Sequence, residues 1–316
     1  MVNKRGFEMS FAWIFAIIVG AIVIFLAIWA TTKLVSVERN IGDTETGKQI
    51  GILLNPVETS LEDAKIAKIT TPLETRIYND CEILKGESFG SQRISVSTKS
   101  GVGKEWDNPG VPSVFHNKYL FSEDVVEGNE FVVFAKPFEF PFKVADLLFL
   151  WSVEDEYCFV NSPQEIYEEI NDLSPEGINV TGSLEECSKK STKVCFGSSG
   201  CDIDVNLGSK SVKKDKGRET IYYEEGLIYG AIFAPKKLYE CQVKRLMSRA
   251  SELSLLYNSK SVYLSSGNCD SITLQSGLAQ YANYTNGLNE SIELRSIRGL
   301  SDELENKNGR LLCKLF

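Results

Sequence analysis

An unbroken apolar run near the start of the chain is its clearest pattern. Residues Phe11–Ala30 are twenty uncharged and mostly large apolar side chains, and they follow a short leader that carries Lys4 and Arg5. Twenty helical residues at a rise of about 1.5 Å each cover roughly 30 Å, the thickness of a bilayer's hydrocarbon core. The run is longer than the apolar part of a cleaved secretory signal, which is usually about 7–15 residues. We therefore expect a transmembrane helix over residues 7–32.

Helical spacing continues beyond this run. Apolar residues recur every three or four positions over residues 34–41, and a second amphipathic stretch covers residues 57–66. Three glycines and Pro56 lie between the two stretches, and both residue types weaken or interrupt a helix. We expect a helical stalk over residues 33–70 with a break near residues 42–56.

Residues 71–160 are predicted to be mainly β. Apolar and polar residues alternate over residues 93–99, which is the pattern of a half-buried strand. Two short apolar runs, residues 131–134 and 147–153, are further strand candidates. Between them phenylalanines alternate around two prolines, and we expect a loop that covers the core rather than an exposed contact patch. Residues 100–112, rich in Gly and Pro, predict another loop.

Residues 161–316 alternate between strand and helix and become helical towards the end. Ser162 suits the N-cap and Pro163 the first position of a helix over residues 164–172. The clearest helical face runs from Tyr239 to Tyr257, with basic residues, including Arg245, off the apolar stripe. Further strands are predicted at residues 193–196, 203–207, 220–223 and 227–233, and a further helix at residues 294–304. The fold class is α+β: a transmembrane helix and stalk, then a disulfide-braced α+β ectodomain whose C-terminal part is helical.

The charge balance limits the classes of partner. The chain has 316 residues and a formal net charge of −9 at pH 7. Nucleic-acid phosphates require neutralisation by Lys and Arg, so no nucleic-acid partner is expected. An acidic balance otherwise indicates solubility, and the sequence predicts no cofactor.

All eight cysteines follow the apolar run and therefore lie on one side of it. An even number confined to one side favours disulfides in an oxidising compartment, and the alternative is a set of buried reduced thiols. Cys195 and Cys201 flank the predicted turn 197–200, so we expect a local bridge between them. Zinc is not expected, because the chain has no Cys-x-x-Cys pair and a single histidine, His116. The cysteines are Cys81, Cys158, Cys187, Cys195, Cys201, Cys241, Cys269 and Cys313.

Three N-glycosylation sequons add to this pattern; they begin at Asn179, Asn283 and Asn289. Together with the cysteines they favour an outside location for the large C-terminal part. Lys4 and Arg5 lie on the short side, but basic residues also follow the apolar run, so the positive-inside rule decides little. We expect a single-pass protein of the cell membrane with a short cytoplasmic N-terminus and the lipid bilayer as a partner.

The leader Lys4-Arg5-Gly6-Phe7 resembles the class III signal of type IV pilins and archaeal pilin-like proteins. The resemblance covers about the first thirty residues. It implies that a membrane aspartyl peptidase cuts between Gly6 and Phe7, and that the freed helix packs with copies of itself or other pilin-like subunits. Bacterial pilins usually carry Glu at the fifth mature position, which here is Phe11, whereas Glu8 is at the second.

The chain as a whole also resembles single-span surface proteins of small-genome archaea, a likeness that implies no activity. The alternative interpretation of Lys4 and Arg5 is a topology determinant for an anchor that is never cleaved.

No catalytic constellation stands out. A Ser-His-Asp or Cys-His site would have to use His116, and the residues near it do not resemble a nucleophile elbow. The turn 197–200 resembles a phosphate loop but lacks the Gly-Lys-Ser/Thr ending. Asp202 and Asp204 are candidate calcium ligands or polar positions on the solvent face of a strand. Five basic residues in 210–218 predict a solvated hairpin tip rather than a patch for an anionic polymer.

These patterns favour a non-enzymatic, membrane-anchored cell-surface protein, either a pilin-like subunit or a component of a surface structure. One alternative is a permanently anchored ectodomain that binds a ligand or a surface. Another is a surface-anchored hydrolase or thiol oxidoreductase, against which the single histidine and the absence of Cys-x-x-Cys argue.

Overall fold

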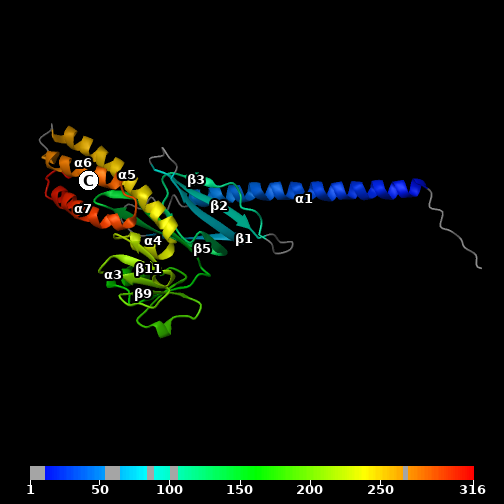
Figure 1. The fold of residues 1–316 in the computed structure, drawn as a ribbon, viewed down its shortest axis with the longest axis horizontal. Helices are drawn as coiled ribbons and strands as arrows, with labels where there is room; N and C mark the ends of the chain where they lie inside the picture. Colours follow the sequence, from blue (N-terminus) through cyan, green and yellow to red (C-terminus); the bar gives the residue numbers. More distant parts are fainter. Residues whose placement is uncertain (1–10, 54–64, 84–88, 100–105, 266–269) are drawn as a thin grey trace, which may run out of the picture.

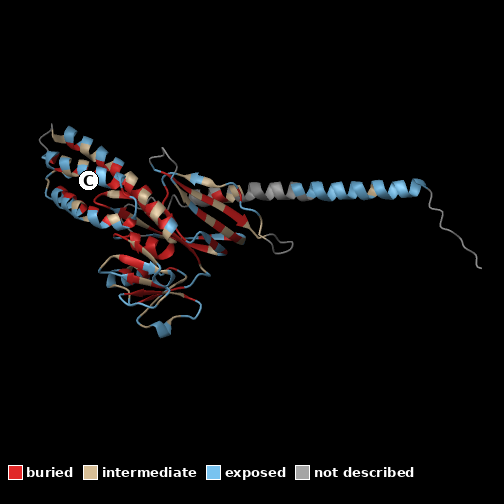
Figure 2. Ribbon diagram, viewed as in Figure 1, coloured by how far each residue is buried: buried red, intermediate tan, exposed pale blue. Residues whose placement is uncertain are grey.

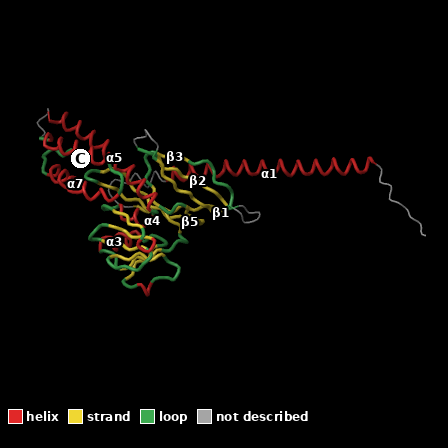
Figure 3. Tube along the Cα trace, in the orientation of Figure 1, coloured by secondary structure: helices red, strands yellow, loops and turns green. Residues whose placement is uncertain are grey.

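The computed structural model describes residues 11–53, 65–83, 89–99, 106–265 and 270–316. A long helix projects from a head that contains two β-sheets and a layer of helices (Figure 1). The tube view separates these parts, with strands in the middle of the head and helices at its far end (Figure 3). The processing residues Gly6 and Phe7, the amphipathic stretch up to residue 64, and Cys269 lie outside the described residues.

Helix α1 (Phe11–Leu53) is one uninterrupted helix of 43 residues. The predicted break from residue 42 onwards is therefore wrong as far as residue 53. Tertiary packing accounts for the difference, because the C-terminal part of α1 lies on the first sheet. A Cβ atom at Gly47 would lie 3.7 Å from the carbonyl oxygen of Ile94 and from a methyl group of Val96. These are ordinary van der Waals distances, so packing on the sheet, rather than the absence of a side chain at this position, accounts for the continuous helix.

Six strands form the first sheet: β1 (Lys65–Glu82), β2 (Ser91–Thr98), β3 (Ser113–Phe115), β4 (Leu120–Phe121), β5 (Val125–Glu139) and β6 (Lys143–Ser152). Their order is β3-β2-β1-β5-β6-β4, and every pair is antiparallel except β4 with β6. The strands predicted at 93–99, 131–134 and 147–153 are confirmed. They lie inside β2, β5 and β6, except for residues 99 and 153, which follow the ends of β2 and β6.

Strand β1 replaces the end of the predicted stalk. Residues 65–70 pair with β5, so the helix expected there is wrong. The ladder is interrupted between Thr70 and Thr75, and Pro72, which has no N–H to donate, lies in this interruption. Helical spacing of the apolar residues was misleading because the partner strand β5 supplies hydrogen bonds that no local pattern reveals.

The aromatic segment between β5 and β6 is part of the core. Phe138, Phe140 and Phe142 are each at most 4% exposed. The rings of Phe140 and Phe142 lie edge-on to Tyr281 of the C-terminal helices, with centroids 6.1 and 5.9 Å away. The expectation of a core-covering segment is confirmed, and its first half is strand rather than loop.

Six shorter strands form the second sheet: β7 (Tyr157–Val160), β8 (Ile178–Thr181), β9 (Thr192–Phe196), β10 (Ile203–Asn206), β11 (Ser211–Lys214) and β12 (Glu219–Tyr222). Their order is β12-β11-β10-β9-β7-β8, and the pairs among β7, β8, β9 and β10 are parallel. The strands predicted at 193–196, 203–207 and 220–223 match β9, β10 and β12 to within one residue at either end.

The fourth predicted strand in this region is wrong, because residues 227–233 form helix α4 (Leu227–Phe233). All seven of its residues are buried. A helix that is apolar on every side shows no helical periodicity, so its sequence resembles that of a buried strand. Phe233 stacks on Trp151 of β6 at a centroid distance of 5.0 Å, and Tyr229 meets Phe134 of β5 edge-on at 5.1 Å.

Four further helices are α3 (Gln164–Leu173), α5 (Lys236–Ser265), α6 (Gln275–Asn286) and α7 (Leu294–Gly309). Helix α5 buries the predicted stripe through Tyr239, Val243, Leu246 and Ala250; α6 packs beside α5, and α7 packs against α6. The predicted N-cap of α3 is wrong by one residue. Pro163 occupies that position, and the buried hydroxyl of Ser162 has no hydrogen-bond partner within the part of the chain that the structure describes.

Disulfides connect these layers. Cys81 of β1 is bonded to Cys241 of α5, across 160 residues of sequence. In the second sheet Cys158 is bonded to Cys187, and the predicted local bridge between Cys195 and Cys201 is present. Cys313 is also disulfide-bonded.

Candidate functional site

The projecting part of α1 is the first candidate site. Phe11–Thr31 has a mean hydropathy of 3.0, and none of it is buried against the head (Figure 2). Within the described residues it is the one helix that is long and apolar enough to cross a membrane. Trp13 and Phe25 are 69% and 68% exposed. A continuous apolar surface of this kind requires lipid or another apolar partner to cover it.

The structure brings three of the sequence motifs together. The turn 197–200, Asp202 and Asp204, and the tip of the β11–β12 hairpin surround an open hollow of 880 Å³. No grouping of His, Cys, Asp and Glu suited to a metal ion occurs among the described residues. The three motifs are therefore neighbours. The hydrogen bonds that their side chains form show whether they could bind a ligand.

Both aspartates brace the loop next to the Cys195–Cys201 disulfide. The Asp204 carboxylate accepts hydrogen bonds from the backbone N–H groups of Gly200 at 3.2 Å and Cys201 at 3.0 Å. Asp202 accepts one from the N–H of Lys193 at 2.9 Å. These carboxylates have a structural role here, and the turn 197–200 is a bridged loop rather than a phosphate cradle.

The hairpin predicted for the basic run 210–218 is present between β11 and β12, and its tip is exposed. The expectation fails for Lys210 and Lys214, whose ammonium groups are bound within the protein. The Lys214 ammonium group donates to the carbonyl oxygens of Ile232 at 2.6 Å and Ala234 at 2.7 Å, at the C-terminal end of α4. Burial lowers the pKa of Lys214 to about 8, and Glu123 and Glu219 partly oppose this shift. Lys213 and Lys216 are exposed.

The remaining predicted residues lie apart from one another. His116 is exposed, with Nδ1 3.0 Å from the carbonyl oxygen of Gly90. Asn179 lies on β8, Asn283 on α6 and Asn289 in the connection that follows α6, and all three side chains are exposed. Their accessibility is what glycosylation requires, and modification itself stays a prediction.

Arg245 of α5 is fully buried, although the sequence placed it off the apolar stripe. Its guanidinium donates to the carbonyl oxygens of Phe89 at 2.9 Å, Lys118 at 2.8 Å and His116 at 3.0 Å. Burial lowers its pKa to about 10, and the ring of Tyr119 lies 4.8 Å from its central carbon. The side chain thus joins α5 to the segment before β2 and to the connection between β3 and β4.

The second candidate site is a cleft where the first sheet, the second sheet and the helical layer meet. We call it the charged cleft. It has a volume of 740 Å³ and lies between the end of β5, helix α3, the β10–β11 connection, the start of α4 and helix α7. Ligand sites commonly lie at such junctions between structural layers. Its lining residues are Lys136, Pro137, Glu139, Pro163, Glu165, Ile166, Glu169, Leu207, Lys210, Tyr223, Glu225, Gly226, Ile228, Tyr229 and Arg298.

One ionic cluster of the charged cleft centres on Glu169 of α3. Its carboxylate accepts a hydrogen bond from Lys136 of β5 at 2.6 Å and another from the hydroxyl of Tyr229. Burial raises the pKa of Tyr229 well above its usual value, and the charge of Glu169 adds to the effect, so Tyr229 remains a donor. The cluster joins the first sheet to α3 and α4.

A second cluster centres on Glu224, which is 2% exposed. One carboxylate oxygen accepts from Lys210 at 2.5 Å and from Arg298 of α7 at 3.1 Å. The adjacent Glu225 has a left-handed backbone with φ of 40° and points its charge to the cleft rim. Desolvation raises the pKa of Glu225; Lys210 opposes the shift, and Glu305 and Glu224 reinforce it.

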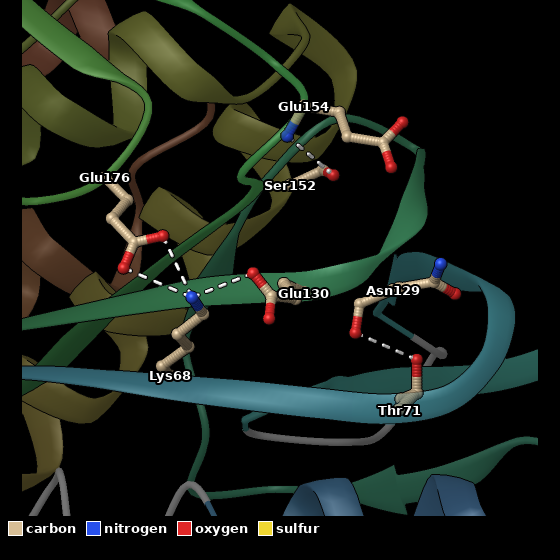
Figure 4. A network of polar contacts seen from close by, with 7 residues as sticks. All are labelled: Lys68, Thr71, Asn129, Glu130, Ser152, Glu154 and Glu176. Carbon is tan, nitrogen blue, oxygen red and sulfur yellow. Dashed lines mark hydrogen bonds and ion pairs between the residues drawn. The ribbon is translucent and has the colours of Figure 1, made fainter.

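A third charged contact lies outside the cleft. Lys68 of β1 stands between Glu130 of β5 at 2.8 Å and Glu176 at 2.9 Å, as Figure 4 shows. The hydrogen bond that Lys68 donates to Glu130 is the main cause of the raised pKa of Lys68. All three side chains are well exposed, so this bridge aligns the two sheets without adding much stability.

Sequence reasoning missed the charged cleft because its residues come from segments that are far apart in the chain. Glu169 lies beside Glu168, and adjacent carboxylates are ordinary in an acidic chain; Lys210 is one of five basic residues in a run. The one local signal was the pair Glu224-Glu225 directly before the apolar residues of α4. Because those apolar residues were predicted to form a strand, the pair was not recognised as part of a site.

Comparison of this chain with known protein families, with curated proteins and with solved structures finds no match.

Proposed function

We propose that this protein is a non-enzymatic, membrane-anchored cell-surface protein of pilin-like design. The observation that carries the proposal is α1, in which a fully exposed apolar segment continues without interruption into a helix that packs on the head. An exposed surface of this kind suits lipid, and later the apolar helices of other subunits.

The basic leader ending in Gly6 supports the same interpretation, because a peptidase cut after Gly6 would free the apolar helix at its start. The three disulfides between described cysteines support a head on the oxidising side of the membrane. The short N-terminus would then be cytoplasmic.

The first experiment is to determine the N-terminal residue of the protein from its native membranes by mass spectrometry. A mature start at Phe7 is expected, and the variant Gly6→Leu should keep the unprocessed start. Gly20→Leu is a matched control within the apolar helix, because a Cβ atom at Gly20 meets no other atom within 4 Å. A native start at Met1 or Val2 would contradict the processed, pilin-like form and leave a plain anchor.

A second candidate function is a permanently anchored ectodomain that binds a ligand. The charged cleft favours it, because the cleft combines apolar walls with a few fixed polar groups, as ligand sites do. This function requires no processing of the leader and no contact between subunits.

A further inference from the structure

We propose that the charged cleft binds a basic group, an ammonium or guanidinium, carried on an aliphatic stem. The proposal deepens the second candidate function, since it names the ligand class of that binding head. It does not depend on cleavage after Gly6. It stands on the shape of the cleft, on its apolar floor and on the way its charges are paired.

The floor of the cleft is apolar and rigid. Ile166 of α3, Ile228 and Tyr229 of α4, and Tyr223 are all at most 8% exposed, and each also lines the cleft. These side chains belong to the large core shared by the two sheets, so they have little freedom to move. An aliphatic stem laid on this floor would bury apolar surface against side chains that are already ordered.

The positive charges of the cleft already have partners. Its three basic side chains are Lys136, Lys210 and Arg298, and each forms an ion pair with Glu169 or Glu224. An anionic ligand would have to compete with these internal carboxylates. Anions are therefore disfavoured as occupants.

The negative charges at the rim do not have such partners. Glu139, Glu165 and Glu225 line the same cleft, and none forms an ion pair within 4 Å among the described residues. Glu225 is partly desolvated, as its raised pKa indicates. Lys210 and Arg298 act on Glu225 only from a distance, so a cation placed beside it would supply the direct ion-pair partner that it lacks among the described residues. Such charge-assisted hydrogen bonds are among the stronger ones.

The test measures binding of three small probes to the full-length chain in detergent by ligand-observed NMR titration. The probes are N-acetyl-lysine methylamide, its uncharged analogue N-acetyl-norleucine methylamide, and the diamine putrescine. We expect the lysine derivative to bind more tightly than the norleucine derivative by about tenfold, the effect of one hydrogen bond to a charged group. Tighter binding of the lysine derivative than of putrescine would indicate a peptide side chain as the natural ligand, and the reverse order a free amine.

Two variants locate the site. Glu225→Gln and Glu165→Gln should each weaken binding of the lysine derivative several-fold, while Glu185→Gln, which neutralises an exposed carboxylate outside the cleft, should leave it unchanged. Circular dichroism of each variant checks that the fold is retained, and Glu165 on the exposed first turn of α3 covers the case in which Glu225→Gln does not fold. Equal binding of the lysine and norleucine derivatives would overturn the proposal. So would unchanged affinity in both cleft variants.

Discussion

The two sheets have the same number of strands but are held in place differently. In the first sheet β1, β5 and β6 contain 18, 15 and 10 residues, whereas every strand of the second sheet has four or five. The second sheet carries two local disulfides, Cys158–Cys187 and Cys195–Cys201. The first carries none between its own strands and is joined to α5 by Cys81–Cys241 and Arg245.

This difference indicates which interactions stabilise each sheet. Long antiparallel strands make enough hydrogen bonds and apolar contacts to hold together, so the first sheet needs attachment mainly to the next layer. Four-residue parallel strands make few contacts each. The chain must also close the loops between them, at a cost in conformational entropy, before those contacts can form. Covalent links across those loops reduce the entropy that the unfolded chain gains.

The largest expected effect tests the attachment of the first sheet. Arg245→Met should destabilise the protein by about 3–5 kcal/mol, because the buried carbonyl oxygen of Lys118 and the partly buried ones of Phe89 and His116 lose a charged donor. The measurement is urea unfolding of the full chain in a mild detergent, followed by circular dichroism.

Arg249→Met is the matched control, one turn further along α5 at a half-buried position. It should cost about 1 kcal/mol or less, as ordinary surface substitutions do. If the two variants lose similar amounts of unfolding free energy, the Arg245 contacts are not what attaches the first sheet to α5.

The next effect concerns the second sheet alone. Replacing Cys158 and Cys187 by Ala should cost about 3.5 kcal/mol, and replacing Cys195 and Cys201 about 2 kcal/mol, because the first pair closes the longer loop. The same unfolding experiment measures both. If neither pair changes the free energy of unfolding, the short strands do not depend on their cross-links.

The smallest effect is a pH dependence from Lys214, which fastens β11 to the end of α4. Its pKa is about 8 in the folded protein and near 10.5 when the chain is unfolded. Below pH 8 the folded state bears the full cost of the buried charge; as pH rises from 8 towards 10.5 the folded chain loses the proton first and stability increases. We expect the stability difference between the wild type and Lys214→Met to shift by about 2 kcal/mol in favour of the wild type between pH 8 and pH 10. A difference that stays constant over this range would show that the ammonium group is not desolvated.

The local sequence pattern was sufficient to predict elements that bury one face in a regular way. The alternation in β2, the 4-3 stripe of α5 and the bridge between Cys195 and Cys201 were all predicted from neighbouring residues. In α5 one side meets the core and the other side meets solvent, and in β2 buried apolar residues alternate with mostly half-buried polar ones, so the sequence shows the difference. The bridge depends only on a short turn between its two cysteines.

Elements buried on all sides, or paired with distant segments, were not predictable in the same way. Helix α4 is covered everywhere, so its seven residues lack a polar face. Residues 65–70 have apolar spacing that suits a helix but pair with residues 130–135 of β5, at least sixty positions along the chain. Arg245 and the charged cleft depend on carbonyl groups and carboxylates that only the finished fold brings together.

The continuity of α1 has a mechanical consequence for the head. A helix of 43 residues is about 65 Å long, and here it has no hinge between the apolar end and the end seated on the first sheet. Transmembrane helices lean by about 20° on average, and they lean further where the bilayer is thin. In the proposed anchor a lean of this size displaces the far end of α1 sideways by roughly 20 Å. The thickness of the surrounding lipid would therefore change the angle at which the head is held above the membrane.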